Sequence, residues 1–189
     1  MLKFLKKVLG KRVADGKCSE APIRLIKLPS IDALFFKHFT ESKYFKSDSY
    51  DKVVKHFKHE IDLNKSGKKL TASEKKELGL NARLSITSEL VSVLSSSGLK
   101  LPDPKNALNQ VYYRASFEAS RIEGFNKMLD IGISTATYNS SNGDKDCLWC
   151  KTNDGMKFTI SEALNNEVNE NCSCDWNRGF FSGDFNFDK

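Results

Sequence analysis

The clearest hydrophobic pattern in the chain lies between residues 105 and 133, where apolar residues recur at intervals of three and four. The repeat consists of Leu108, Val111, Tyr112, Ala115, Ala119, Ile122, Phe125, Leu129 and Ile133. Such residues share one face of an α-helix, so the spacing predicts a helix of about seven turns. Asp103 and Pro104 precede it as a cap and a residue suited to the first turn. On its other face, we interpret Glu118 and Arg121 as a surface ion pair.

Three shorter helices are predicted between residue 30 and this one. Ser30 is a suitable N-cap for a helix over 31–39, and a second apolar stripe predicts a helix over 50–63. The third, over 72–95, begins with Thr-Ala-Ser-Glu, which has the capping-box pattern. Gly79 marks a point where this third helix would be interrupted.

The pattern changes from helical to alternating after Gly132. Residues 134–138 are alternating and rich in β-branched side chains, which predicts a strand. Asn-Asp-Gly at 153–155, followed by Met-Lys-Phe-Thr-Ile, predicts a turn into another strand. The Phe-rich tail, 179–189, is interpreted as a strand that joins a partner's sheet or as an end whose aromatics dock elsewhere. The predicted class is α+β: a mainly helical N-terminal half and a long helix leading into a small cysteine-closed module.

These elements predict four regions along the chain. A basic arm with a short amphipathic helix occupies 1–29, a helical region 30–104, the main domain 105–178 and the Phe-rich tail 179–189. No apolar run approaches the ~18–20 residues of a membrane span. The N-terminus is too short and too charged for a secretory signal, so we expect synthesis in a reducing cytoplasm.

Charge is divided unevenly between the two halves of this chain of net charge +6. Residues 1–100 hold 21 basic and 11 acidic residues, a net charge of +10, whereas 101–189 hold 9 and 13, a net charge of −4. The basic half suits a phosphate-rich or acidic partner. Because most of the positive charge is on lysine, contact with DNA would neutralise charge without reading bases.

Four of the five cysteines lie close together in sequence, as Cys147-x-x-Cys150 and Cys172-x-Cys174. Two such pairs predict a tetrahedral metal site of four thiolates, with zinc as the expected ion. Two disulfides or buried free thiols are the alternatives. A redox dithiol is disfavoured because a turn into a strand follows Cys150, instead of the helix of a thioredoxin-like unit.

No other group of residues predicts chemistry. His56, His59 and Glu60 lack the His-Glu-x-x-His order of a metalloprotease, and we interpret them as part of a solvated face. The acidic residues near the cysteines, Asp144, Asp146 and Asp154, are interpreted as turn formers. No nucleophile is accompanied by a base and an orienting group, and no cofactor motif is present, so the chain is predicted not to be an enzyme.

The order of motifs resembles the C-terminal domain of phage head morphogenesis proteins, of the phage Mu minor head protein type. The matching features are a long helix with Arg114 and Glu118, a strand, and then the two cysteine pairs. The matching residues are Asp144, Cys147, Cys150, Asp154, Gly155, Phe158, Cys172 and Cys174. The resemblance covers roughly residues 105–176. The family's histidine before the last pair is absent, since Val168-Asn-Glu-Asn171 stands there.

The resemblance implies a structural role in the virion. Such proteins are minor head components at the portal vertex or inner capsid, acting in head assembly and in DNA packaging or ejection. It implies portal or major capsid protein as partner, packaged DNA beside the lysine-rich half, several copies per particle, and a path from host cytoplasm to capsid. A zinc-ribbon protein that binds nucleic acid non-specifically is the alternative. A phage-associated toxin or transferase domain is disfavoured because the Arg…Ser-x-Ser…Glu-x-Glu set is missing.

Overall fold

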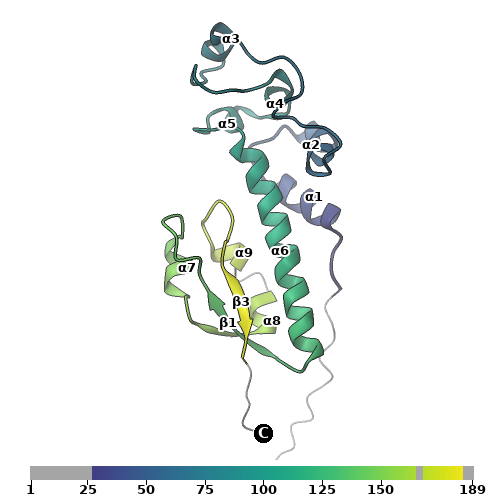
Figure 1. Cartoon of the computed structure of the whole chain (residues 1–189), viewed down its shortest axis with the longest axis vertical. Helices are drawn as coiled ribbons and strands as arrows, with labels where there is room; N and C mark the ends of the chain where they lie inside the picture. Colours follow the sequence, from purple (N-terminus) through teal and green to yellow (C-terminus); the bar gives the residue numbers. More distant parts are fainter. Residues whose placement is uncertain (1–26, 165–167, 185–189) are drawn as a thin grey trace, which may run out of the picture.

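The fold is built around one long helix, α6 (Asn106–Asp130), which runs through most of the molecule (Figure 1). The computed structural model describes residues 27–164 and 168–184 of the chain, so the amphipathic helix predicted at the N-terminus lies outside the described residues. The other helices are α1 (Ile31–Glu41), the 3-10 helix η1 (Ser47–Ser49), α2 (Tyr50–Phe57), α3 (Ala72–Glu77), α4 (Ser88–Val93), α5 (Ser96–Leu99), α7 (Leu148–Thr152), α8 (Ile160–Glu162) and α9 (Val168–Asn171). The strands are β1 (Thr135–Asn139), β2 (Lys157–Thr159) and β3 (Phe180–Gly183). The predicted α+β class is confirmed.

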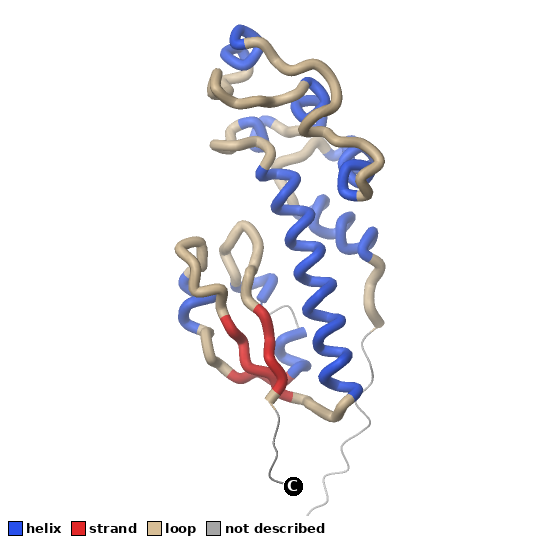
Figure 2. The backbone as a smooth tube through the Cα atoms, in the orientation of Figure 1, coloured by secondary structure: helices blue, strands red, loops and turns tan. Residues whose placement is uncertain are grey.

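Helix α6 contributes to two separate hydrophobic cores. Its N-terminal half, including Leu108 and Val111, packs into a helical core with residues of α1, α2 and α4. Near its other end, Phe125 packs with Ala136 and Ile160 beneath the sheet. Figure 2 shows α1 on one side of α6 and the strands on the other. The long helix is therefore the element that joins the helical region to the sheet.

The sheet has three antiparallel strands in the order β2-β1-β3. Ala136 of β1 pairs with Phe158 of β2, and Tyr138 pairs with Phe181 of β3. The described part of the Phe-rich tail thus completes a sheet within its own chain. The interpretation of this part as a partner's strand or a docking end was wrong, because β1 offers a free edge that β3 covers.

The local end signals were confirmed, but two helix lengths were overpredicted. Ser30 and Thr71 cap α1 and α3, and Thr71 forms the predicted capping box. The helix predicted over 50–63 ends at Phe57, since His59 has a left-handed φ of 61°. The helix predicted over 72–95 is broken: α3 ends two residues before Gly79, whose φ is 69°, and α4 begins only after Thr87.

The polar residues around α6 also differ from expectation. The helix begins at Asn106, after a turn in which Asp103 Oδ1 accepts a hydrogen bond from the backbone N–H of Lys105. Glu118 is buried and pairs with residues of α1, so its interpretation as one half of a surface ion pair was wrong. Across the described ranges, no helix combines the length and apolar character that crossing a membrane requires.

Candidate metal centre

The four cysteines of the two motifs come together at one point. Their sulfur atoms all lie within 4.8 Å of one another. Cys147 Sγ is 3.7 Å from Cys150 Sγ and 3.9 Å from Cys172 Sγ. Cys150 Sγ is 3.6 Å from Cys172 Sγ and 3.7 Å from Cys174 Sγ. Within the described part of the chain, this is the cluster of cysteine, histidine or acidic side chains suited to hold a metal ion.

These separations are those of a tetrahedral metal site. Four sulfurs that each lie ~2.3 Å from a central zinc ion are ~3.8 Å apart, close to the observed distances. A disulfide requires an S–S distance of about 2.05 Å, and all four cysteines are free. The disulfide alternative is therefore not the arrangement in this structure. The donor set and its spacing fit a divalent, thiophilic ion.

One half of the centre is a short helix that begins directly after Cys147. Cys147 is the residue before α7, and one turn brings Cys150 back to the same side. The sequence predicted a turn into a strand after Cys150 and missed this helix, which has five residues and ends at Thr152. Gly155, with a φ of 76°, then turns the chain into β2, as the sequence predicted. Because β2 and β1 are antiparallel, the motif is unlike a thioredoxin-like unit.

Two aspartates of this region support the turn that follows β1. Asp146, which is buried, accepts hydrogen bonds from the hydroxyl of Ser141 at 2.6 Å and the N–H of Gly143 at 3.3 Å. Asp154 Oδ1 accepts the N–H of Ser140 at 2.7 Å. Their interpretation as turn formers is confirmed for these two residues, because both carboxylates are used by the backbone or by neighbouring hydroxyls.

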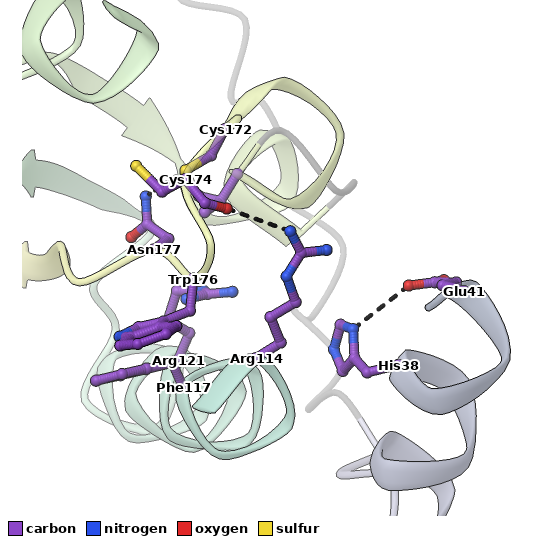
Figure 3. Close-up of a pocket in the computed structure, with 10 residues that line it drawn as sticks. His38, Glu41, Arg114, Phe117, Arg121, Cys172, Cys174, Trp176 and Asn177 are labelled. Carbon is purple, nitrogen blue, oxygen red and sulfur yellow. Dashed lines mark hydrogen bonds and ion pairs between the residues drawn. The ribbon is translucent and has the colours of Figure 1, made fainter. Parts of the chain in front are cut away.

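The other half of the centre is fastened to α6. Cys174 Sγ accepts a hydrogen bond from the N–H of Cys147 at 3.2 Å, which joins the two halves directly. The guanidinium of Arg114 donates to the carbonyl of Cys174 at 3.2 Å (Figure 3). It also donates to the carbonyl of Asp175 at 2.7 Å. The long helix therefore fixes the backbone that presents the last two sulfurs.

Two residues outside the cysteine motifs complete the surroundings. Asn177 Nδ2 lies 3.3 Å from Cys150 Sγ and 3.4 Å from Cys172 Sγ, and it donates to the hydroxyl of Tyr138 at 2.8 Å. Tyr138 and Asn177 are both buried. Sequence reasoning missed both, because nothing about an Asn three positions after a cysteine distinguishes it from an ordinary turn residue.

The thiols of Cys147, Cys150 and Cys174 differ in acidity. Burial acts to raise the pKa of Cys147, but N–H groups of Cys150 and Ser173 and the Ser173 hydroxyl outweigh it and lower that pKa to about 6. Burial, together with neighbouring cysteines, raises the pKa of Cys174 to about 11 and that of Cys150 further. Four negative charges this close repel one another strongly, so complete ionisation requires a cation among them.

The remaining polar groups are placed elsewhere. His56 and His59 line a separate cavity of about 220 Å³ with Tyr112 of α6, at a distance from the cysteines in the chain and in the fold. Between α1, α6 and the cysteine loop lies a cavity of about 40 Å³, lined in part by His38 and Arg114 (Figure 3). That volume is enough for about one or two water molecules.

No protein-family model, no curated protein and no solved structure matches the chain.

Proposed function

We propose that the chain is a structural minor head protein of a phage or phage-derived element, whose C-terminal module is held together by a zinc ion on Cys147, Cys150, Cys172 and Cys174. The observation that carries the proposal is the convergence of four sulfurs at the positions of the family resemblance. The long helix, strand and cysteine pairs occur in the order that the resemblance requires. The zinc ion, when bound, supplies no reaction in this role; it crosslinks two segments of the chain.

The first test concerns the ion. The full chain, purified without added chelator, is expected to contain about one zinc equivalent by elemental analysis. Cys150→Ser should abolish this content. Cys18→Ser removes the fifth cysteine, which lies outside the cysteine motifs, and should leave the content unchanged. Equal metal content in both variants would exclude the four-cysteine centre.

The second test concerns the role in the virion. Head assembly at the portal vertex or inner capsid requires that the chain copurify with particles, in several copies, and crosslink to portal or major capsid protein. Mass spectrometry of purified immature and mature particles gives this result directly. Absence from both kinds of particle would overturn the structural role, including any part in DNA packaging or ejection.

The alternative, a non-specific nucleic-acid binder, is favoured by one surface feature. The guanidinium of Arg178 lies 4.2 Å from the ring of Trp176, which itself lies 4.9 Å from the ring of Tyr113. Aromatic rings beside a cation are suited to stacked bases and phosphate. Salt-dependent binding of DNA by the full chain that Trp176→Ala abolishes, together with absence from particles, would support this alternative.

A further inference from the structure

The amide of Asn177 is aimed at the metal centre and cannot be placed the other way round. Its oxygen, Oδ1, accepts the backbone N–H of Gly179 at 3.0 Å. The nitrogen must therefore face Cys150, Cys172 and Tyr138, where its three contacts lie between 2.8 and 3.4 Å. Figure 3 shows the side-chain nitrogen of Asn177 on the side of the cysteine sulfurs. An amide flip would lose all these interactions at once.

Tyr138 extends the same network. Its hydroxyl accepts from Asn177 and forms a hydrogen bond with the sulfur of Cys150. Because the oxygen of this hydroxyl accepts the amide N–H of Asn177, its own proton is available for the bond to the sulfur. Cys150 thus has two side-chain donors around its sulfur, one from Asn177 and one from Tyr138.

The donors cover all four sulfurs when the backbone is included. Cys147 receives hydrogen bonds from Ser173, and Cys174 receives the N–H of Cys147. For Cys150 and Cys172, the shared side-chain donor is Asn177. Four thiolates around a divalent cation carry a net charge of −2, and burying that charge is unfavourable unless hydrogen bonds delocalise it. Donors in the outer shell also fix the direction of the ligand lone pairs.

We propose that Asn177, supported by Tyr138, is a positioning residue of the metal centre that holds Cys150 and Cys172 in the geometry that a thiophilic divalent ion requires. The inference rests on the proposed zinc site and adds to it the side chain that sets its affinity. The alternative is a purely structural role, in which Asn177 only stabilises the turn before Gly179 through its side-chain oxygen. The two roles use different atoms of one side chain, so they can be separated.

The experiment uses Asn177→Asp and Tyr138→Phe in the full chain. Asn177→Asp keeps the oxygen that accepts from Gly179 and replaces the donating nitrogen, while Tyr138→Phe keeps the ring and removes only the hydroxyl. The matched control is Asn139→Asp on β1. Asn139 Nδ2 donates to the Thr137 carbonyl and the Ser182 hydroxyl, and it bonds no sulfur. The probes are cobalt(II), read by its thiolate charge-transfer band, and competition of zinc for that site.

Asn177→Asp is expected to weaken zinc binding by about 10- to 100-fold and to shift the charge-transfer band, as loss of outer-shell donors does. Tyr138→Phe is expected to shift the band with a smaller loss of affinity, and Asn139→Asp to change neither. A wild-type chain that binds neither cobalt nor zinc would overturn the metal centre itself. If wild type binds and Asn177→Asp matches Asn139→Asp, only the role of Asn177 is overturned. Should Asn177→Asp fail to fold, Tyr138→Phe decides: a shifted band supports the inference and an unchanged band overturns it.

Discussion

Nε2 of His38 lies 2.7 Å from Oε2 of Glu118, which joins α1 to the middle of α6 across 80 positions of sequence. The other carboxylate oxygen of Glu118 accepts from Lys37 Nζ at 2.9 Å. Burial acts to raise the pKa of Glu118, but the hydrogen bonds from His38 and Lys37 outweigh it and lower that pKa to about 2. Glu118 is therefore an ionised acceptor inside the protein, and His38 Nε2 donates to it.

Replacing this acceptor should destabilise the contact between the two helices. We expect Glu118→Gln to lower the free energy of unfolding by about 1–3 kcal/mol, because a charged hydrogen-bond acceptor is lost from a buried place. Urea denaturation measures the change. The control is Glu123→Gln, which removes an exposed ion pair with Lys127 from the same helix and should have no measurable effect. Equal effects of the two substitutions would contradict this account.

The same carboxylate predicts a dependence of stability on pH. The folded pKa of Glu118, about 2, lies below its ordinary value of 4.5, so its stabilisation is complete above pH 4.5 and is lost as pH falls toward 2. The difference in unfolding free energy between wild type and Glu118→Gln should therefore shrink over this range. Taking the difference cancels the contributions of groups that do not interact with Glu118. A difference that stays constant as the pH falls would show that Glu118 is not the group responsible.

Replacing Gly98 and Gly124 by alanine should change the stability of the protein in opposite directions. A Cβ on Gly98 would collide with the backbone carbonyl of Tyr44 and would lie 3.0 Å from a methyl group of Leu94. A Cβ on Gly124, within α6, would meet nothing within 4 Å. We expect Gly98→Ala to destabilise by about 1–3 kcal/mol through overpacking. Gly124→Ala should stabilise by about 0.5–1 kcal/mol through helix propensity. Thermal unfolding of the two variants checks both signs.

Loss of one ligand of the proposed metal site should destabilise the core beneath the sheet and leave the helical core folded. In Cys150→Ser, we expect amides of β1, α7 and β2 to lose protection from hydrogen exchange, because two segments are no longer crosslinked. Amides of α1 and of the N-terminal half of α6 belong to the helical core and should stay protected. Hydrogen exchange followed by mass spectrometry makes this comparison, with Cys18→Ser as the control. Uniform loss of protection along the chain would mean that the two cores unfold as one unit.

Short-range features of the fold were predictable because their causes are short-range. Ser30 and Thr71 cap the helices that follow them through bonds to residues three positions later. The spacing of the apolar residues gave the long helix to within a few residues at each end. The cysteine pairs marked the four-sulfur cluster for a similar reason, since the short spacing within each pair brings its two sulfurs together.

The features that were missed depend on contacts distant in sequence. Nothing beside Glu118 in the sequence shows that His38 will lie against it, so an acidic residue on a helix was interpreted as exposed. Asn177 contacts Tyr138, 39 positions away, and only the assembled sheet brings them together. The break near Gly79 was visible as one residue, but the loop that follows it buries Leu80 and Ile86 in the helical core, and the neighbours of these two side chains are distant in sequence.

The division of α6 between two cores has a consequence for how the chain is made. All buried residues of the helical core lie between Leu34 and Ala115, so this core can consolidate while the ribosome is still translating the remainder. The second core must wait for β3, because the central strand β1 stays open on one side until Phe180–Gly183 emerges. During that interval Cys147 and Cys150 are already outside the ribosome without Cys172 and Cys174. A metal ion bound by all four sulfurs, as proposed, therefore requires that Cys174 has emerged from the ribosome.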